Sequence, residues 1–509
     1  MAWTRPVNIA AIDAGSNALR LVIARAASPS SCQELKSERV ALRLGHDAFT
    51  QRQFDAHTID RAADVFRRFK SRMNQYDVQR YRAVATSAAR DARNRKLLVE
   101  RIYRTSGIRL EVIDAPEEAR LTRTAVLAAV GTRMAPRLIA DLGGGSLQVS
   151  LLRDGALESI ASLSVGTVRL MEKFAIRGAL SRQQEELVRQ RAQTFFRRFL
   201  PAGGARLEPM VWCGGNAEAL ALLAPGKPFQ GFPTLSVEQL GRMLRRITRK
   251  DVWERMKTFR VRQDRAEVMA IAAIVFHELG RWGNVQRAVV PGVGVKEGVL
   301  QDVLRSLSGQ EPEALRGSEL LSAARQFAVR LSYDARHCEA VCDFAAALFD
   351  ALRPWHGLGE EARCLLQIGA LLHDIGHSVH RESHHKIGEY LVRNGNIPGL
   401  SQAQRQLVAC LVRYHSESAP SADHKLYASL PASKQREVRL LVSLLRIADR
   451  LDSDHRQSVS GLKVRIRRGR MVLLLKMKRA SELILWNVQH GGELLEEEYG
   501  LKLQARRVF

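Results

Sequence analysis

The spacing of hydrophobic and polar residues along the chain predicts where strands and helices occur. Residues 7–26 and 138–153 each have the pattern of a strand, a turn and a second strand, and each is followed by further strand and then by helix. Residues 235–307 are mostly helical in pattern. From about residue 318 to 458, Leu, Ile and Ala recur at i, i+3 and i+4, which predicts one helix after another. The last fifty residues return to strand character.

These changes of pattern divide the chain into four predicted domains. We expect two α/β domains, then an all-α domain, and finally a small, basic, β-rich domain of the α+β class. The predicted boundaries are 1–122 and 123–304 for the α/β domains, 315–458 for the helical domain and 459–509 for the C-terminal domain. The stretch "RSLSGQEPEALRGS", residues 305–318, has the composition of a linker.

An internal repeat links the two predicted α/β domains. The stretches "IDAGSNALRLVI" (12–23) and "ADLGGGSLQVSL" (140–151) share a strand, an Asp, a turn that contains Gly, and a second strand. Their alignment matches Asp13 with Asp141, Gly15 with Gly143, Leu19 with Leu147 and Arg20 with Gln148. Two such hairpins facing each other would surround one ligand. Small turn residues leave backbone N–H groups for phosphate oxygens, and the two Asp residues offer carboxylates to a phosphate-bound divalent metal.

The net charge of +26 indicates an anionic partner, such as nucleic acid, a membrane surface or a polyphosphorylated substrate. The cations cluster in residues 241–265 and in residues 463–479, where a predicted hairpin turning near Gly469 alternates Lys and Arg on one face. Extended basic tracks of this kind suit a long polyanion. No recognised nucleic-acid motif accompanies them, so we expect no specific nucleic-acid partner.

Other features of the composition are typical of a cytoplasmic protein. No apolar run has the length of a bilayer span, and the N-terminal stretch lacks the layout of a signal peptide, so we expect no membrane association. The six Cys residues are scattered, and their only close pair, Cys338 and Cys342, has helix spacing. We therefore expect reduced thiols, with neither a disulfide framework nor a Cys-type zinc site.

Seven stretches within residues 7–302 resemble, in order, the motifs of the exopolyphosphatase/guanosine pentaphosphate phosphohydrolase family. They are "AAIDAGSNALRLVIA" (10–24), "VATSAARDARN" (84–94), "EEARL" (117–121), "IADLGGGSLQVSL" (139–151), "SVGTVRL" (164–170), "GGNAEALA" (214–221) and "GVKEGVL" (294–300). The resemblance implies two actin-like (ribonuclease H-like) α/β domains, the fold of sugar kinases and Hsp70. The C-terminal half resembles the HD-type helical domain that longer members of the family carry.

The resemblance also implies a reaction, the hydrolysis of a terminal phosphoanhydride bond, usually with Mg²⁺. Such a reaction requires an activated water and groups that hold the phosphoryl oxygens. In the family the general base is the second Glu of the pair in "APEEARL", which is Glu118 here. The first, Glu117, has capping-box spacing from Asp114 and therefore has a local task at the start of a predicted helix.

The remaining contacts in the cleft between the two α/β domains also follow from the resemblance. The implied phosphate-binding residues are Gly15, Ser16, Asn17, Arg90, Gly143, Gly144, Gly145, Ser146, Gly215 and Asn216. The turn at 214–216 departs from the Gly–Thr form that many members carry. The implied Mg²⁺ ligands are Asp13, Asp141 and Gln148. The family usually has Glu where this chain has Gln148, and the neutral amide is expected to lower metal affinity and turnover while the phosphate-binding turns remain.

A second group of candidate ligands lies in the predicted helical domain. The order His337, His373, Asp374, Asp449 matches the HD phosphohydrolase motif residue by residue, and such a set can bind one or two divalent ions such as Mn²⁺. His373, His377 and His380 recur at i, i+4 and i+7 on a helical pattern. Additional ligands or phosphate contacts are available from His384, His385 and His415.

Three functions are open from the sequence. The first is a phosphohydrolase that uses Glu118 to release orthophosphate from the end of inorganic polyphosphate or from guanosine pentaphosphate. The second places the working site in the HD-type domain, with the N-terminal module binding anions. The third, suggested by Gln148, is a non-catalytic sensor of polyphosphate or alarmone. The long basic tracks favour polyphosphate, and the resemblance by itself predicts a homodimer.

Overall fold

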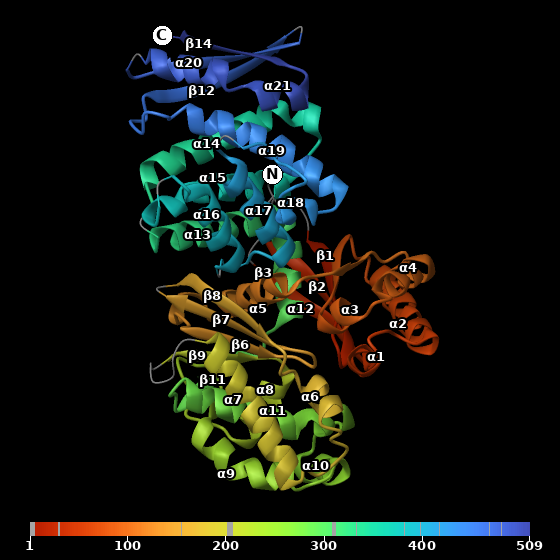
Figure 1. Ribbon diagram of the computed structural model, residues 1–509. Coiled ribbons are helices and arrows are strands. Elements are labelled where there is room, and N and C mark those ends of the chain that lie inside the picture. The colour runs from red at the N-terminus through yellow and green to blue at the C-terminus, as the bar shows by residue number, and fades with distance from the viewer. Residues whose placement is uncertain are drawn as a thin grey trace. The chain divides into compact units, whose positions relative to one another are not determined.

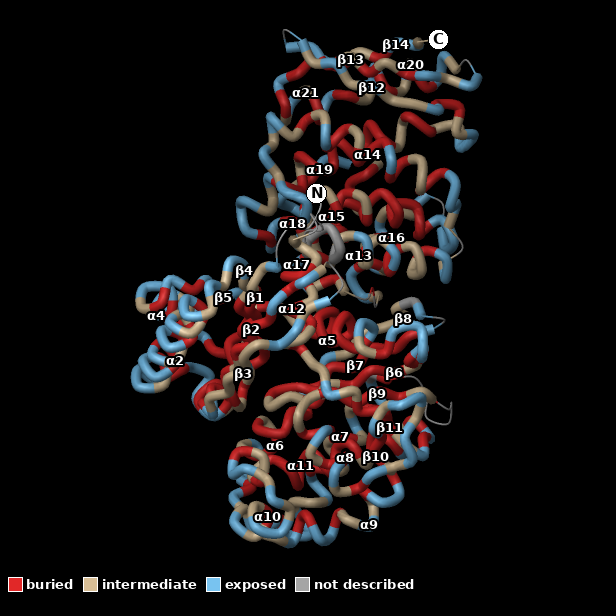
Figure 2. The backbone as a smooth tube through the Cα atoms, turned by 180° about the vertical axis from the view of Figure 1, so that it is seen from behind, coloured by how far each residue is buried: buried red, intermediate tan, exposed pale blue. Residues whose placement is uncertain are grey.

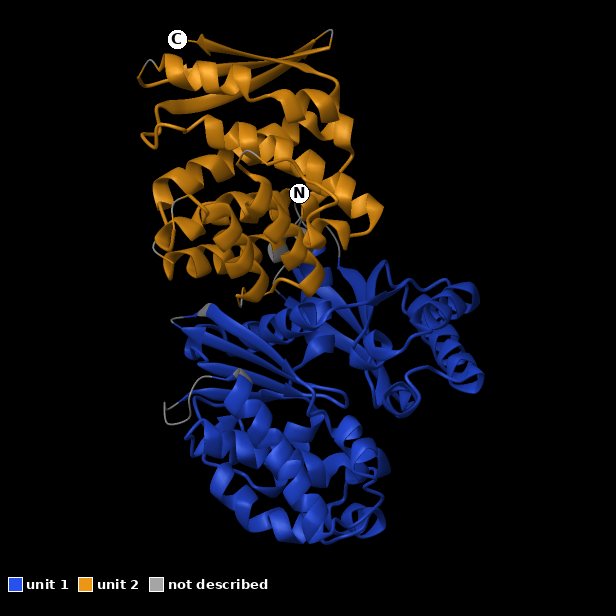
Figure 3. Cartoon of the chain, viewed as in Figure 1, with its two compact units in different colours: residues 1–312 blue, residues 313–509 orange. Residues whose placement is uncertain are grey.

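The computed structural model describes residues 6–28, 31–153, 155–200, 207–307, 312–331, 333–380, 382–395, 397, 399–416, 418–467, 469–479 and 481–508. The chain divides into two compact units, residues 1–312 and 313–509 (Figure 3), and each is described by itself. Within the described residues, no helix combines the length and the hydrophobicity that a membrane crossing requires.

Unit 1 contains two mixed sheets (Figure 1). Five strands follow an equivalent order in both, and the second sheet adds a sixth strand at one edge. The spatial order of the first sheet is β3 (Ser31–Ala41), β2 (Ala18–Ser28), β1 (Val7–Ala14), β4 (Arg80–Ala85), β5 (Leu110–Val112). The order of the second is β8 (Ala156–Leu163), β7 (Leu147–Arg153), β6 (Leu138–Leu142), β9 (Met210–Cys213), β11 (Arg287–Val289), β10 (Thr234–Ser236). In both, three antiparallel strands are joined in parallel by the fourth. This duplicated topology is the actin-like fold that the sequence predicts.

The two hairpins of the sequence repeat also share their register. Asp13 pairs with Arg20 across β1 and β2, and Asp141 pairs with Gln148 across β6 and β7. Because side chains alternate between the two faces of a strand, an equal register places the two Asp residues at equivalent positions in their sheets. The alignment made from sequence is therefore confirmed as a structural repeat.

Helices cover the faces of both sheets. In the first half they are α1 (Leu44–Thr50), α2 (Ala56–Gln75), α3 (Ser87–Asp91), α4 (Arg95–Ser106) and α5 (Ala115–Val130), with a 3₁₀ turn at Gly131–Arg133. In the second half they are α6 (Thr167–Lys173), α7 (Arg182–Phe199), α8 (Gly215–Leu223), α9 (Val237–Thr248), α10 (Val252–Phe259) and α11 (Gln263–Trp282). The last helix of unit 1, α12 (Val295–Ser306), returns to pack on β1 and β4 of the first sheet, whereas α5 packs on β6, β7 and β8 of the second. Most of α11 is buried (Figure 2). Helices α5 and α12 cross so closely that a Cβ at Gly298 would come within 2.0 Å of the Leu121 carbonyl oxygen.

Unit 2 combines helices with a small sheet. The helices are α13 (Pro312–Val329), α14 (Ala335–His356), α15 (Glu360–Leu372), α16 (His384–Asn394), α17 (Gln402–Tyr414), α18 (Lys425–Ala428), α19 (Ala432–Arg450), α20 (Glu482–His490) and α21 (Glu493–Tyr499). The sheet has the order β12 (Val459–Arg467), β13 (Arg470–Met477), β14 (Lys502–Val508). A single hydrophobic core includes both helix residues such as Leu441 and strand residues such as Leu473.

The predicted basic hairpin is present in unit 2. Strands β12 and β13 pair in antiparallel fashion and turn at Gly469, which has a φ of +69°. Lys463, Arg465 and Arg467 alternate with less exposed residues along β12, so they lie on one exposed face. The four domain boundaries drawn from the sequence stay a prediction.

Candidate functional site

Unit 1 contains a cavity of about 530 Å³ lined by the turns of both repeat hairpins. The predicted site residues in its lining are Asp13, Gly15, Ser16, Asn17, Glu118, Asp141, Gly143, Gly144, Gly215 and Asn216. Ten residues from distant parts of the sequence thus face one space. The duplicated fold brings them together, because each half contributes one hairpin.

The two turns are built alike. The N–H of Gly15 donates to the Ala18 carbonyl at 3.1 Å, and the N–H of Gly143 donates to the Ser146 carbonyl at 3.0 Å. These hydrogen bonds close two tight loops at equivalent positions of the repeat. Loops of small residues let a phosphate group come close to the backbone, as in other phosphate-binding turns.

Four predicted site residues lie next to the cavity but are not part of its lining: Arg90, Gly145, Ser146 and Gln148. Arg90 donates to the Glu118 carboxylate at 2.7 Å. Gln148 Nε2 donates to the same carboxylate at 3.3 Å and to Ser146 Oγ at 3.0 Å. Gly145 packs too closely against the start of α3 to carry a Cβ. Arg90 and Gln148 therefore contact the candidate base in this structure, where the sequence predicts contacts with phosphate and metal.

Glu118 is a buried carboxylate, 7% exposed, in the first turn of α5. Asp114 begins that helix as its N-cap and accepts a hydrogen bond from the Glu117 N–H at 2.8 Å, as the sequence predicts. Burial raises the pKa of Glu118, Arg90 opposes the rise, and the charge of Asp13 adds to it. A carboxyl group with a raised pKa beside phosphate-binding turns is suited to accept a proton from water near neutral pH.

The two Asp residues of the repeat have different partners. Asp13 forms an ion pair with Arg20 at 2.7 Å, whereas Asp141 accepts a hydrogen bond from the Thr122 hydroxyl at 3.1 Å. Burial, together with the nearby charge of Glu118, raises the pKa of Asp141 to about 7. The charges of Glu118 and Asp13 therefore both disfavour the charged form of Asp141.

This donor set fits a hard divalent cation such as Mg²⁺. Carboxylate and amide oxygens are the protein ligands that Mg²⁺ prefers, and Asp13, Asp141 and Gln148 offer both kinds. The Gln148 amide oxygen is buried and has no hydrogen-bond partner among the described residues. A cation at this place would stabilise the charged form of the carboxylates and give the amide oxygen a partner.

Glu117 has a larger role than the capping box that its spacing predicts. Its buried carboxylate accepts from Arg120 Nε at 2.7 Å and from Arg82 Nη2 at 3.0 Å. Both Arg residues also pair with Asp302 on α12, which is fully buried. The four side chains form one ion-pair network that joins β4, α5 and α12. Sequence reasoning missed this network because its members lie far apart along the chain.

Sequence analysis did not assign individual cations to the cavity. Its lining includes Arg20, Arg39, Arg262, Arg265 and Lys296. Arg265 Nη1 donates to Asn216 Oδ1 at 2.6 Å, and burial together with Arg20 and Arg39 lowers the pKa of Arg265 to about 10. Arg guanidinium groups bind phosphate oxygens well, so this wall suits a phosphate chain.

The cations of the basic stretch 241–265 have different roles. Arg255 is fully buried and donates to the carbonyls of Ile247 at 2.8 Å and Ala266 at 3.0 Å, so it holds the fold together. Only the end of the stretch, with Arg262 and Arg265, reaches the cavity. The signal in the sequence was the charge itself, which does not distinguish a packing Arg from a phosphate-binding one.

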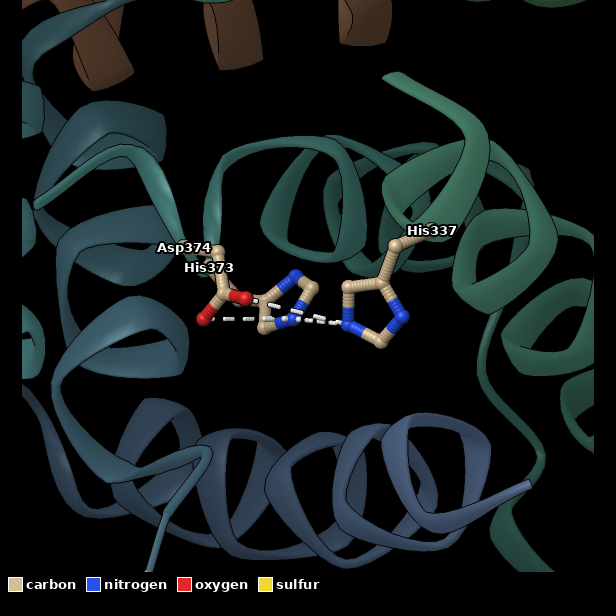
Figure 4. Close-up of side chains that lie close together, drawn as sticks. All are labelled: His337, His373 and Asp374. Atoms are coloured by element: carbon tan, nitrogen blue, oxygen red, sulfur yellow. Dashed lines mark hydrogen bonds and ion pairs between the residues drawn. The ribbon is translucent and has the colours of Figure 1, made fainter. Parts of the chain in front are cut away.

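In unit 2 the four residues of the HD-type motif come together. His337 Nε2 lies 3.2 Å from His373 Nε2 and 3.7 Å from Asp374 Oδ2 (Figure 4). It also lies 3.3 Å from Asp449 Oδ1. His373 Nε2 lies 3.5 Å from Asp374 Oδ1 and 3.6 Å from Asp449 Oδ1. Both imidazoles are fully buried. The side chains come from α14, the end of α15 and α19.

The hydrogen bonds of the two imidazoles indicate why a metal ion fits between them. His373 Nδ1 contacts the Ala370 carbonyl at 2.7 Å, and His337 Nδ1 contacts Asp452 at 3.0 Å. With a proton on each Nδ1, the two neutral rings point their Nε2 lone pairs at each other. That arrangement is stable only with a proton or a metal cation between the nitrogens. The set of two imidazoles and two carboxylates suits Mn²⁺, Fe²⁺ or Zn²⁺.

Three more imidazoles surround Asp374. Its Oδ1 lies 3.4 Å from His377 Nε2, 3.8 Å from His384 Nε2 and 3.6 Å from His415 Nε2. The Nε2 atoms of His384 and His415 are 3.1 Å apart. Asp374, His377 and His384 form a second group with the spacing of metal ligands. The sequence named His384, His385 and His415 as additional ligands or phosphate contacts. The structure brings His384 and His415 to this carboxylate, together with His377.

The predicted helix through residues 373–380 is wrong. Helix α15 ends at Leu372, and a short 3₁₀ helix follows at Ile375–Ser378. His377 still reaches Asp374, but His380 is exposed. The 3₁₀ segment packs so closely against the start of α16 that a Cβ at Gly376 would come within 2.0 Å of the His384 carbonyl oxygen.

Comparisons with known proteins extend these observations. Residues 22–307 match the Ppx/GppA phosphatase family, and residues 321–489 match domain III of Ppx/GppA phosphatases. The guanosine-5'-triphosphate,3'-diphosphate pyrophosphatase of Photobacterium profundum is 26% identical over 458 residues, covering 86% of this chain and 87% of the relative.

Solved structures show the same fold over about three fifths of the chain. A Ppx/GppA family member from Aquifex aeolicus is 24% identical, with a TM-score of 0.50 over 60% of this chain and 100% of its own. An exopolyphosphatase from Cytophaga hutchinsonii ATCC 33406 is 22% identical, with a TM-score of 0.51 over 59% of this chain and 98% of its own. Because the family match over residues 22–307 spans more than half of the sequence, the chain belongs to the Ppx/GppA phosphatase family and is a phosphoanhydride hydrolase.

Proposed function

We propose that this protein releases orthophosphate from the end of inorganic polyphosphate, in the cavity of unit 1, with Glu118 as the general base. The observation that carries the proposal is the buried Glu118 carboxylate in the wall of a cavity lined by both Gly-rich turns. The names of the relatives support the reaction class, since one is a pyrophosphatase of a guanosine polyphosphate and another is an exopolyphosphatase.

The chemistry follows from the placement of these groups. The terminal phosphate lies between the turns at Gly15 and Gly143, and Glu118 accepts a proton from water as the water oxygen attacks the terminal phosphorus. The bond from that phosphorus to the bridging oxygen breaks, and the shortened chain leaves with the bridging oxygen. Arg90 holds the Glu118 carboxylate in position. Asp13, Asp141 and Gln148 would hold a divalent cation, which would supply positive charge to the phosphoryl oxygens.

Polyphosphate is favoured over guanosine pentaphosphate by the charge of the lining. Arg39, Arg262, Arg265 and Lys296 offer several cationic contacts, and each unit of a polyphosphate chain carries negative charge. The test is phosphate release from long-chain polyphosphate and from guanosine pentaphosphate, measured side by side with Mg²⁺ and with Mn²⁺. Faster release from polyphosphate is expected. A clear preference for guanosine pentaphosphate would contradict the substrate assignment, and tight binding of both without release would favour the sensor function.

A second candidate function is a metal-dependent phosphohydrolase in unit 2. It is favoured by the cluster of His337, His373, Asp374 and Asp449, whose donors suit Mn²⁺. The test uses the Glu118→Gln chain, in which the cavity of unit 1 is expected to be inactive. Hydrolysis that appears with Mn²⁺ and disappears with an added His373→Ala substitution would support this function, and its absence would leave unit 2 without a catalytic role.

The assembly of the protein is proposed from the family resemblance. We expect a homodimer in the cytoplasm, with no membrane association and no specific nucleic-acid partner. Light scattering of the purified chain measures its mass in solution, and a monomer at all accessible concentrations would contradict the dimer.

A further inference from the structure

Unit 2 contains a second cavity, of about 490 Å³, that the proposed functions leave unexplained. Four cations line it: Arg336 at the start of α14, Arg456 in the loop between α19 and β12, and Lys478 and Arg479 after β13. Three separate segments of the chain thus contribute cationic side chains to one cavity. Converging cations of this kind repel one another unless an anion lies between them.

The cavity holds little negative charge of its own. Asp334 is the single carboxylate in the lining, and it is engaged by the His337 N–H at 3.2 Å and by His455 Nδ1 at 3.2 Å. Within the described part of the chain, Arg336, Arg456, Lys478 and Arg479 form no ion pair with a carboxylate. The side chains that line this cavity therefore carry a net positive charge.

The loop that forms one wall of the cavity is fixed in place. Asp452 is fully buried and accepts from the Gln457 N–H at 2.7 Å and from Gln457 Nε2 at 3.1 Å. The Ser458 hydroxyl donates to Asp454 at 2.6 Å, and the His455 ring stacks on the buried His337 ring at 3.9 Å between centroids. A wall held by buried hydrogen bonds loses little entropy when a ligand binds, which favours affinity.

We propose that this cavity binds a small oligophosphate, the phosphate groups lying between Arg336, Arg456, Lys478 and Arg479. Guanidinium and ammonium groups are the side chains that recognise phosphate oxygens, and four of them match the charge of a di- or triphosphate group. Inorganic tripolyphosphate and the triphosphate of a nucleotide share this chemistry. The proposal goes beyond the hydrolytic function of unit 1 and does not depend on it.

The test is calorimetric titration of the full chain with a methylene-bridged tripolyphosphate analogue, which cannot be hydrolysed. Two binding events are expected, one in each unit. The double substitution Arg456→Ala/Lys478→Ala should weaken one of them by about tenfold. The control is Arg467→Ala/Lys476→Ala, which removes the same charge from exposed positions of β12 and β13 outside the cavity and should leave both events unchanged.

Circular dichroism and thermal melts of the full chain monitor the folding of unit 2 in both variants, and phosphate release by unit 1 is expected to be unchanged. If a loop variant fails to fold, Lys478→Gln/Arg479→Gln tests the same cavity from the strand side. Equal affinities of the double variant and its control, or a single binding event that neither variant alters, would overturn the proposal. A methylene-bridged nucleoside triphosphate separates the ligand sources: equal affinity assigns recognition to the phosphates, and tighter binding adds a contact with the base.

Discussion

The cavity of unit 1 that contains Glu118, here called the cleft, and the His/Asp cluster of unit 2 both bury carboxylates. The pKa of these carboxylates is shifted upward in the cleft and downward in the cluster. In the cleft, burial and neighbouring carboxylates raise the pKa of Asp141 to about 7 and raise that of Glu118. In the cluster, burial acts in the same upward direction, but nearby imidazoles outweigh it and lower the pKa of Asp374 and Asp449. Burial raises the pKa of all four carboxyl groups, and the charge of the neighbouring groups decides whether that rise persists or is reversed.

The same difference predicts which ions the two regions bind. The cleft offers oxygen donors and an excess of negative charge around Glu118, which suits Mg²⁺. The cluster offers imidazole nitrogens, and its hydrogen bonds with Asp449 and Asp452 outweigh burial to raise the pKa of His337 to about 9. A transition metal would replace that proton. The two regions should therefore respond separately to substitutions and to metals, and five predictions test this separation.

The largest expected effect is on the reaction in the cleft. Glu118→Gln should lower phosphate release about a hundredfold or more, because the water loses its base, while polyphosphate binding persists. Glu218→Gln is the matched control, since Glu218 also lines the cavity but is exposed on α8. Steady-state release and equilibrium binding are measured for both. Equal loss in the two variants would contradict the role of Glu118.

In the cluster, the double substitution His373→Ala/Asp374→Ala should remove most of the bound transition metal. Both residues supply donors within 3.7 Å of another candidate ligand. Elemental analysis of purified protein measures metal per chain, with His380→Ala as the control because His380 is exposed. Mg²⁺-dependent release in the cleft should be unchanged. Equal metal content in the variant and the parent would show that His373 and Asp374 do not bind the metal and have only a structural role.

The ion-pair network beneath the cleft predicts a large effect on stability. Glu117→Gln leaves Arg82 and Arg120 partly unpaired in a buried place, so the free energy of unfolding of unit 1 should fall by about 3 kcal/mol. Glu111→Gln is the comparison, since Glu111 pairs with the same Arg82 but is half exposed. Urea denaturation measures both. If Glu117→Gln lowers the free energy of unfolding by less than about 1 kcal/mol, the ion-pair network contributes little and the role of Glu117 is limited to the helix cap.

The raised pKa of Asp141 predicts a dependence of stability on pH. Its folded pKa of about 7 lies above the ordinary value of 3.8, so the stability that Asp141 contributes is present below about pH 4 and is lost as the pH rises through 7. Asp141→Asn removes that loss, worth up to about 4 kcal/mol, and should stabilise unit 1 at pH 8 but not at pH 4. Thermal melts in EDTA measure the difference, and an equal shift at both pH values would contradict it.

The smallest expected effect concerns Gln148. Gln148→Glu adds a carboxylate next to Glu118, so the Mg²⁺ concentration for half-maximal activity should fall by about threefold. Without bound Mg²⁺ the added charge raises the pKa of Glu118 further, and activity at low Mg²⁺ should need a higher pH. Mg²⁺ titrations at saturating substrate and two pH values measure both effects. An unchanged half-saturating concentration would place residue 148 away from the metal.

Local patterns in the sequence determined much of this protein. Asp13 and Asp141 were aligned by a short repeat, and their equal register follows from the period of two along a strand. Asp114 begins α5 because its side chain caps the helix within one turn. The order of His337, His373, Asp374 and Asp449 identified the cluster before any geometry was known. In each case the signal lies within a few residues, or in a motif that the resemblance supplied.

Only the tertiary structure decided which partners these residues have. Arg90 contacts Glu118 from 28 positions away, Arg120 meets Asp302 from 182, and the cations at Arg336, Arg456 and Lys478 converge from three segments. Charge and spacing along the chain are the same for an exposed Arg, a buried packing Arg and a phosphate-binding Arg. Their energies differ because burial and neighbouring charges depend on which distant segments pack together, and that is a property of the folded chain.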